Sequence, residues 1–409
     1  MDRGEAAVGL ARSDDAAAKR AAAERLIPAI EAAAEESEKA QHQSDAVIAE
    51  LRRSGLYSML LPKALGGGEL DFVDAMRIVE RLAWADGSAG WCTMVAGVMA
   101  ASAGAFLPDA GAKMIYGKGA DVTLAGNGVP RGFARRVDGG YRIKGHWAYG
   151  SGIYHAEWIH SGCFIVDDSG KPILNPDGSP EIVLMHHPRD TIELKGNWDV
   201  LGLRGTGSFD YVQKGEEVFV PEATTYSFDA ETPRRGGTQY QIGLVGFTAW
   251  GHTSWALGVG RRALDEIARL SRERSDVFGL LADSPSFRKS FAEAEAKYRS
   301  ARAFVYESWN SIRDSSARGA APTLEQIALL RLAMRHIHDV LSEVTTMAHR
   351  YSRGVSLRSS KLQRAYRDAH GGTQHLLLAD EIELEVAKVL LGVAKEGARW
   401  TMFAVRDAG

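Results

Sequence analysis

The chain has little cysteine, little proline and no marked excess of either charge. Its 409 residues include 2 cysteines and 12 prolines. Cys92 and Cys163 have no Cys-x-x-Cys or Cys/His spacing, so they predict neither a disulfide framework nor a metal site, and we expect a cytoplasmic protein. The 49 Lys and Arg residues against 52 Asp and Glu residues give a formal net charge of -3. No long basic tract is present, so we expect neither nucleic acid nor a membrane as a partner.

Long apolar runs are also scarce. The first twenty residues mix acids with bases and lack the apolar segment of a secretory signal. The one long run, Ala89 to Leu107, has the length of about 18 residues or more that a membrane span requires. It is rich in Ala and Gly and contains Thr93 and Ser102. We therefore expect a helix buried on all sides within a helical domain, with a membrane span as the alternative.

The pattern of apolar residues divides the chain into three parts. Residues 1–118 carry helical stripes, with Phe72, Met76 and Val79 on one face of a helix. Residues 119–232 hold short apolar runs separated by turn sequences such as "VDGG" and "NPDGSP", which predict antiparallel strands. Residues 233–409 return to long helical stretches with short joins. The expected class is α+β, mostly α: an N-terminal helical domain, a central antiparallel β-barrel domain and a C-terminal four-helix bundle.

Five segments resemble one known family in the same order along the chain. They are "ADGSAGW" (85–91), "GGYRIKGHWAYGSG" (139–152), "LGLRGTGSFDYVQKGEEVFVPEA" (201–223), "LGVGRRALDEI" (257–267) and "LQRAYRDA" (362–369). Together they span nearly the whole chain and are similar to segments of the acyl-CoA dehydrogenase fold. The resemblance implies a flavoprotein and a homotetramer.

The stretch "HWAYGSG" is similar to the loop that faces the flavin in that family. Its glycines, including Gly152, let the backbone approach a planar ligand closely. Trp147 and Tyr149 offer aromatic faces, and Ser151 has a hydroxyl able to bond a ring nitrogen. The alternative from these residues alone is a strand end packed by aromatic rings and followed by a glycine turn.

Three arginines are expected, from the resemblance, to bind the cofactor. Arg204 belongs to "GLRGTG", which is not a Walker loop because no Lys-Ser/Thr follows it. Arg367 belongs to "YRDA". Arg274 opens "RSDVFG", which is similar to the family's Arg-x-x-Phe-Gly, whose arginine holds the cofactor pyrophosphate across a subunit interface. This segment is one residue longer here, which leaves FAD and FMN both open.

The segment "YRDAHGGTQHLLLADE" (366–381) lacks the base of a dehydrogenase. A dehydrogenase removes a proton with a carboxylate placed within hydrogen-bond reach. When the family pattern is aligned from Tyr366 onwards, the position of the family's catalytic Glu is occupied by Leu376 in this chain, and the position of the family's Tyr is occupied by His375. Some family members supply the Glu from the first long bundle helix, but residues 233–264 contain no Asp or Glu. Both routes to dehydrogenation are therefore closed.

The remaining resemblance is to the two-component flavin monooxygenases of this fold, which include aromatic hydroxylases, dibenzothiophene monooxygenases and indole oxygenases. These enzymes have a Trp-x-Phe/Tyr-x-Ser-Gly motif and a His seven residues after the Asp of Arg-Asp, which is His375 here. The resemblance implies reduced FAD (FADH2) or reduced FMN (FMNH2) from a separate NAD(P)H flavin reductase. It also implies O2 as co-substrate and a flavin C4a-hydroperoxide that oxygenates an apolar aromatic or indole-like small molecule.

His375 and Ser151 are the expected catalytic residues. His375 follows Gly371, Gly372 and Thr373, a sequence that predicts a helix start, and a helix N-terminus lowers the pKa of an imidazole. The alternative is a buried structural histidine, which is also how we interpret His336, His338 and His370.

The expected substrate pocket is apolar and contains no histidine in "GWCTMVAGVMAASAG". Such a pocket suits a substrate that is already nucleophilic at carbon, such as an indole. Core packing is the alternative for its two methionines. The pocket residues are Trp91, Met94, Met99, Trp250 and Leu376. A dehydrogenase with a non-standard base and a non-catalytic scaffold remain as alternative functions.

Overall fold

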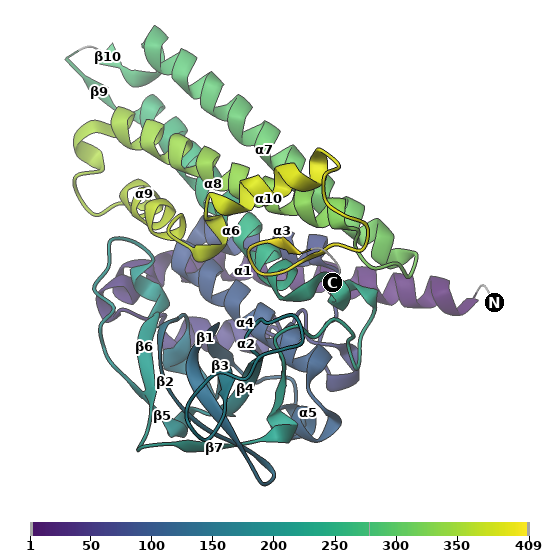
Figure 1. The fold of residues 1–409 in the computed structure, drawn as a ribbon. Helices are drawn as coiled ribbons and strands as arrows, with labels where there is room; N and C mark the ends of the chain where they lie inside the picture. The colour runs from purple at the N-terminus through teal and green to yellow at the C-terminus, as the bar shows by residue number, and fades with distance from the viewer. Residues whose placement is uncertain (1–2, 278, 407–409) are drawn as a thin grey trace.

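The computed structural model describes residues 3–277 and 279–406. The strands of the large sheet lie together on one side of the molecule, and the long C-terminal helices lie on the other (Figure 1). The N-terminal helices are α1 (Arg3–Ala40), α2 (Asp45–Arg53), α3 (Phe72–Ala85), α4 (Gly87–Phe106) and α5 (Asp109–Tyr116). The C-terminal helices are α6 (Gly243–Glu273), α7 (Pro285–Ala317), α8 (Leu324–Ser352), α9 (Lys361–Gly372) and α10 (Glu381–Leu390). The large sheet comprises β1 (Leu124–Val137), β2 (Gly140–Gly150), β3 (Trp158–Val166), β4 (Ile182–Pro188), β5 (Ile192–Leu194), β6 (Phe209–Gln213), β7 (Val218–Pro221) and β8 (Thr225–Ser227). Two short hairpins pair β9 (Ser275–Asp276) with β10 (Gly279–Leu280) and β11 (Arg399–Trp400) with β12 (Val405–Arg406).

The helices begin where the sequence provides side-chain caps. The Asp71 carboxylate accepts the Asp74 N–H at 3.0 Å at the start of α3, which satisfies a backbone donor that the helix leaves open. Ser360 does the same for Gln363 at the start of α9. The predicted stripe of α3 is buried as expected, including Met76.

The apolar run of the first domain is confirmed as a helix buried on all sides. It forms α4, which is long and apolar enough to cross a membrane, but 94% of its most apolar window is enclosed by the protein. Its small residues let neighbouring helices approach closely. A Cβ atom at Gly90 would lie 2.5 Å from the Ala83 side chain of α3, so α3 and α4 meet at van der Waals distance only because position 90 has no side chain.

The sheet is mixed, which corrects the expectation of purely antiparallel strands. Its strand order is β5-β6-β2-β1-β3-β4-β8, with β7 also paired to β2. β1 and β3 run parallel, whereas the other neighbouring strands run antiparallel. The register of β1 on β3 shifts on either side of Pro130, because proline has no N–H for the ladder. The pairings among the described strands do not close the sheet into a ring.

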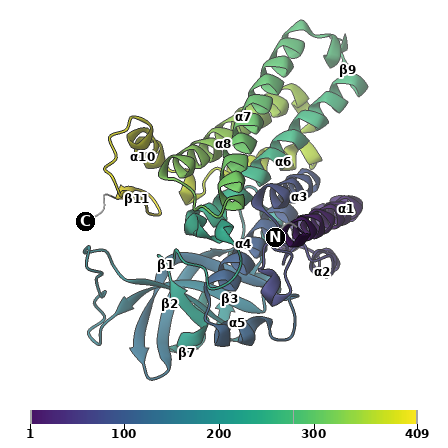
Figure 2. The ribbon, with the colours of Figure 1, turned by 90° about the vertical axis from the view of Figure 1, so that its right-hand side faces the viewer.

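The helices of the two chain ends share one hydrophobic core, and the sheet has its own. α3 packs on α6, and α4 contacts both of them. The sheet core is a separate cluster around Trp147 and Tyr211. Figure 2 shows the sheet below, the bundle helices α6, α7 and α8 above, and α4 between them. The candidate site lies where the start of α4 meets the end of β2.

Candidate active site

Trp91 lies at the centre of the candidate site. It is in the first turns of α4, which begins after Asp86, whose carboxylate accepts the Ala89 N–H at 2.8 Å and caps the helix. The Trp91 indole N–H donates to the Ser151 hydroxyl oxygen at 3.0 Å. Because Ser151 directly follows β2, this bond joins the helical body to the sheet.

A chain of hydroxyl groups continues from Ser151. The Ser151 and Ser208 hydroxyl oxygens are 2.7 Å apart, and the Ser208 and Thr206 oxygens are also 2.7 Å apart. The Thr206 hydroxyl then donates to the Leu203 carbonyl at 2.8 Å. All four residues are buried. Short hydrogen bonds in a buried setting reinforce one another and hold Ser151 in a single orientation.

Two histidines contact the Trp91 ring, and a third contacts one of these two. His252 of α6 lies edge-on to Trp91, with the ring centroids 5.0 Å apart. His375 precedes the short 3-10 helix η9 (Leu376–Leu378), and its ring centroid is 4.1 Å from that of His252 and 6.0 Å from that of Trp91. His338 of α8 lies 6.2 Å from His252, centroid to centroid. The fold thus brings His375, Trp91 and Ser151 together, as the sequence predicts.

All three imidazoles are neutral near pH 7. Burial lowers the pKa of His375 and of His338 to about 4, and it lowers the pKa of His252 well below its usual value. The His375 Nδ1 atom accepts the Leu377 N–H at 3.3 Å, which leaves the ring proton on Nε2. The His338 Nδ1–H donates to the Met334 carbonyl at 2.8 Å. Its Nε2 atom and the Nδ1 atom of His252 are buried without a hydrogen-bond partner.

The helix start that the sequence predicts after Thr373 is present, but only as the short 3-10 helix η9, which begins at Leu376. Helix α9 ends at Gly372, and Thr373 is its C-terminal cap, with its N–H bonded to the Ala369 carbonyl. His375 is the N-terminal cap of η9. Burial, followed by the neighbouring His338, lowers the pKa of His375. The expected neutral imidazole is present, but its cause is desolvation and not a helix terminus.

A second group of histidines lies inside the sheet and is bonded internally. The His160 Nδ1 and His186 Nε2 atoms are 2.9 Å apart, and the His187 Nε2 atom is 3.0 Å from the Ser161 hydroxyl. Burial lowers the pKa of His186 to about 4 and of His187 to about 3. Within residues 3–277 and 279–406, no group of three His, Cys, Asp or Glu side chains is placed to hold a metal ion. Burial keeps His186 and His187 neutral, and their ring nitrogens bond to His160 and Ser161.

The end of β2 presents an exposed aromatic ring beside glycine backbone. Tyr149 is 66% exposed and has a φ of +61°, a left-handed conformation that strains a non-glycine residue. Its N–H donates to the Asp210 carboxylate at 3.3 Å, and its ring meets the edge of Trp198 at 6.2 Å. Gly152 follows with a φ of +74°. An exposed tyrosine ring, supported by the half-buried Trp198 and followed by side-chain-free backbone, fits a planar ring system such as that of a flavin.

Trp147, in contrast, is a residue of the sheet core. It has no exposed surface, its indole N–H donates to the Gly162 carbonyl at 2.8 Å, and its ring stacks on Tyr211. A Cβ atom at Gly132 would lie 2.2 Å from the Trp147 ring, so the glycine makes room for it. The expectation that Trp147 offers a face to the cofactor does not hold, because both of its faces are covered by the protein.

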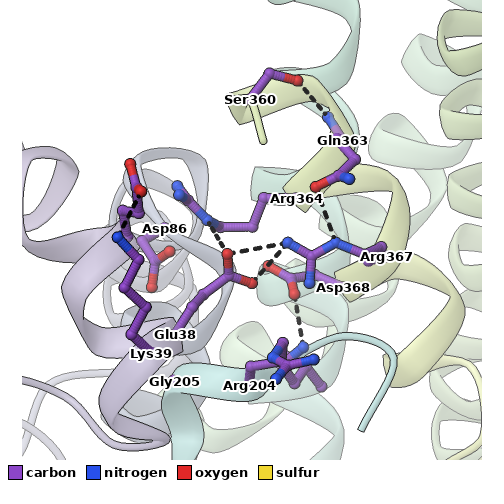
Figure 3. Close-up of polar contacts among 12 residues, drawn as sticks. Glu38, Lys39, Asp86, Arg204, Gly205, Ser360, Gln363, Arg364, Arg367 and Asp368 are labelled. Atoms are coloured by element: carbon purple, nitrogen blue, oxygen red, sulfur yellow. Dashed lines mark hydrogen bonds and ion pairs between the residues drawn. The ribbon is translucent and has the colours of Figure 1, made fainter. Parts of the chain in front are cut away.

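Arg367 joins α9 to α1 instead of pointing to a ligand. Its Nη2 atom donates to both Glu38 carboxylate oxygens, at 2.8 Å and 2.9 Å (Figure 3). Its Nε atom donates to the Gln363 side chain and its Nη1 atom to the Leu201 carbonyl, both at 3.1 Å. Because all three nitrogens already have partners within the chain, the structure does not support the expected cofactor contact of Arg367.

The other two arginines differ in their distance from the site. Arg204 lies in the same short 3-10 turn as Thr206 of the hydroxyl chain. Its Nη1 atom donates to the Val200 carbonyl at 3.2 Å. Arg274 is exposed at the C-terminal end of α6, about 33 Å along the helix from His252 at 1.5 Å per residue. Within one chain it does not reach the Trp91 cluster. Phe278 of the same motif lies outside the described residues.

The predicted pocket residues divide between the site and the core. Met94 packs on α6, where a Cβ atom at Gly251 would lie 2.7 Å from the Met94 Cβ atom. Trp250 has no exposed surface and packs on α4 and Phe72, and Met99 is also buried in the helical core. Leu376 is 48% exposed on η9, next to His375. Met94 and Leu376 therefore lie beside the site, whereas Trp250 and Met99 fit the core-packing alternative.

Sequence reasoning missed several residues of the site. His252 is not an acid, and it lies five residues before the segment 257–267 that resembles the family, so neither signal in the sequence points to it. Ser208 and Thr206 were treated only as part of a loop motif, yet they continue the hydrogen bonds of Ser151. Ser208 and Thr206 stand inside a segment that resembles the family, whereas His252 stands outside all five of these segments.

Two family models match the chain. The model described as "Acyl-CoA dehydrogenase, N-terminal domain" matches residues 14–106, and the model described as "Acyl-CoA dehydrogenase, C-terminal domain" matches residues 250–380. Both matches agree with the helical parts of the structure. The second match includes His252 of α6 and His375.

Similar proteins include flavin-dependent oxygenases. The indole-3-acetate monooxygenase of Pseudomonas putida is 33% identical over 84% of this chain and 86% of its own length. The FADH2-dependent resorcinol hydroxylase, oxygenase component, of a Rhizobium species is 26% identical over 89% of this chain and 91% of its own. The crystal structure of a 3-HSA hydroxylase from Rhodococcus sp. RHA1 superposes with a TM-score of 0.84 at 25% identity, covering 92% of this chain and 97% of the other.

Proposed function

This chain belongs to the flavin-dependent monooxygenases that have the acyl-CoA dehydrogenase fold, and from this premise we propose that its site oxygenates an electron-rich aromatic ring of the indole type. The chain is the oxygenase component of a two-component system, and it uses reduced flavin that a separate reductase supplies. The printed name of the Pseudomonas putida relative supports indole derivatives as the class of substrate.

The observation that carries this proposal is the uncharged cluster around Trp91. Its polar members are the Ser151 hydroxyl and histidines that burial keeps neutral. Leu376 stands beside His375 where a dehydrogenase would carry its carboxylate. Reduced flavin and dioxygen together supply an electrophilic oxygen atom, and this chemistry needs a site from which water is excluded and in which neutral donors are held in place.

Each residue of the cluster has a role that follows from its contacts. The exposed Tyr149 ring and the Gly152 backbone would bind the flat flavin ring, with Ser151 at one of its nitrogens. Neutral His375 has its proton on Nε2 and can donate a hydrogen bond without adding charge. Trp91 bonds Ser151 and contacts the His375 ring, so it fixes the two groups relative to each other.

The experiment supplies the purified chain with chemically reduced FAD or FMN, indole and oxygen-18 gas, and measures labelled product by mass spectrometry. We expect one labelled oxygen atom per product molecule. Flavin oxidation to hydrogen peroxide with no oxygenated indole would reject the substrate class. Bleaching of bound oxidised FAD by an acyl-CoA without air would support a dehydrogenase, and failure to bind either flavin would support a scaffold.

Replacement of His375 tests the site itself. His375→Ala should lower the fraction of reduced flavin that yields product, while the fold and the binding of reduced flavin are retained. His336→Ala is the matched control, because His336 is exposed on the outer face of α8. Equal product yields from both variants would remove His375 from the mechanism.

We also propose that the protein is a homotetramer in which Arg274 contributes to a neighbouring subunit's flavin site. Arg274 is exposed and remote from the site of its own chain. Light scattering gives the subunit number, and Arg274→Ala should weaken the binding of reduced flavin. Unchanged affinity in a confirmed tetramer would contradict the role of Arg274.

A further inference from the structure

The hydroxyl chain that begins at Ser151 has a fixed hydrogen-bond direction. At one end, the Trp91 indole N–H is a donor without acceptor capacity, so the Ser151 oxygen accepts this bond. At the other end, the Thr206 hydroxyl donates to the Leu203 carbonyl, and a carbonyl can only accept. The two ends together decide where each hydroxyl proton between them lies.

The direction follows from counting protons. Thr206 uses its one hydroxyl proton on the Leu203 carbonyl, so in its contact with Ser208 it accepts. Ser208 therefore donates to Thr206 and accepts from Ser151. The Ser151 proton is thus directed into the protein, towards Ser208. What Ser151 retains for a ligand is one oxygen lone pair, which accepts a hydrogen bond and cannot donate one.

Reversing the chain has a physical cost. If Ser151 turned its proton outward, Ser208 would donate to Ser151 and Thr206 to Ser208, and the bond from the Thr206 hydroxyl to the Leu203 carbonyl would be lost. That carbonyl would keep the Trp198 indole N–H at 3.0 Å and the Thr206 N–H at 3.1 Å as donors. The forward direction therefore has one more hydrogen bond within the protein than the reverse one, and it is favoured by about the net value of one such bond.

The two redox states of a flavin differ in what they offer at the ring nitrogens. The oxidised ring has one bare acceptor nitrogen, N5, in its central ring, whereas reduction by two electrons converts it to an N–H donor. A hydroxyl that can only accept a hydrogen bond pairs with the N–H of the reduced flavin. It cannot donate to the bare nitrogen of the oxidised flavin, so that state loses the hydrogen bond.

We propose that Ser208 and Thr206 are positioning residues that fix the Ser151 hydroxyl as a hydrogen-bond acceptor, so that the site selects reduced over oxidised flavin. This inference rests on the proposed function, because it places Ser151 beside a flavin ring nitrogen. Such selection suits an oxygenase component that must take up reduced flavin from solution and release oxidised flavin afterwards.

The experiment measures the dissociation constants of oxidised and reduced FAD and FMN, the latter without oxygen, and takes their ratio. The wild-type chain should bind the reduced form more tightly. Ser208→Ala removes the acceptor of the Ser151 proton and should reduce the ratio by about fivefold to tenfold, the value of one hydrogen bond. A tenfold loss corresponds to about 30 mV in the potential of the bound two-electron couple.

Threonine 206 offers a matched pair of variants. Thr206→Val keeps the shape and removes the hydroxyl, which frees Ser208 to donate to Ser151 and should also reduce the ratio. Thr206→Ser keeps the hydroxyl and should leave the ratio unchanged. In a Ser151→Ala background, Ser208→Ala should have no further effect, because the group through which it acts is gone.

The outcomes separate this inference from the proposed function. Equal binding of both redox states by the wild type, or a ratio unchanged in both Ser208→Ala and Thr206→Val, overturns the inference even if indole is oxygenated. If the wild type oxygenates no aromatic compound but retains a ratio that depends on Thr206, the function proposal fails and the inference stands. If neither redox state binds, both fail.

Discussion

At the scale of single residues, His252 has the features of a functional group kept at the expense of stability. It is 4% exposed, and its Nδ1 atom has no hydrogen-bond partner although the ring contacts His375 and Trp91. Leaving such an atom unpaired costs about 1–3 kcal/mol. Residues of this kind in native proteins are concentrated at functional sites.

Replacing His252 with phenylalanine should therefore separate stability from activity. His252→Phe fills a similar volume without the unpaired nitrogen, so the free energy of unfolding should rise by about 1–3 kcal/mol, while the yield of oxygenated product should fall. Denaturant unfolding and product analysis measure the two effects. His336→Phe on the exposed side of α8 is the control. A less stable variant with full activity would show that His252 serves packing alone.

At the scale of elements, α9 is bonded to the loop that carries the hydroxyl chain. The Asp368 carboxylate accepts the Leu203 N–H at 2.6 Å, and a Cβ atom at Gly202 would lie 2.0 Å from the Arg367 carbonyl oxygen. Leu203 thus donates to α9 through its N–H and accepts from Thr206 through its carbonyl. The helix that leads to His375 and the loop that orients Ser151 are held as one unit.

The Asp368 carboxyl makes this junction depend on pH. Burial and then the nearby Asp86 raise its pKa from 3.8 to about 7. Between these two pH values the folded chain binds a proton that the unfolded chain has released, so the free energy of unfolding falls as the pH rises through this window. Asp368→Asn keeps an oxygen for the Leu203 N–H and has no proton to release.

We therefore expect Asp368→Asn to gain stability relative to the wild type as the pH rises from 4 to 8, measured by denaturant unfolding at several pH values. Glu50→Gln provides the control, because Glu50 is a carboxylate near the surface in a pair with Arg53. A constant difference between variant and wild type across this range would mean that Asp368 is ionised in the folded protein at every pH tested.

The same junction shows what the sequence could predict and what it could not. Periodicity identified α3 and the buried α4 because each pattern is local to its own helix. The parallel pairing of β1 with β3 and the end of α9 at Gly372 were not predicted, because both depend on contacts between distant segments. His375 and Ser151 were predicted through the family resemblance. The unpaired nitrogen of His252 and the direction of the hydroxyl chain exist only in the assembled structure.

At the scale of the whole molecule, buried histidines in both cores must remain neutral. Burial lowers the pKa of His186, His338 and His375 from 6.5 to about 4, and that of His187 to about 3. Between these values and pH 6.5 the unfolded chain binds more protons than the folded chain, so the free energy of unfolding falls as the pH falls. The sheet and the helical body share this sensitivity.

The histidines and Asp368 act in opposite directions, and their numbers decide the outcome. Below pH 6.5, four histidines with these lowered pKa values outweigh the single Asp368, whose pKa of about 7 favours the folded state in acid. At pH 6.5 the unfolded histidines are only half titrated, and the protons that they lose above this pH slightly outnumber the one that Asp368 releases around pH 7.

We therefore expect the free energy of unfolding to rise from pH 4 and to level off at about pH 8, measured by denaturant unfolding from pH 4 to 9. In Asp368→Asn the rise between about pH 6 and pH 8 should be larger, because the opposing contribution of Asp368 is gone. Stability that rises steadily towards pH 4 would show that the histidines are protonated in the folded protein, and would remove the neutral histidine cluster on which the proposed site depends.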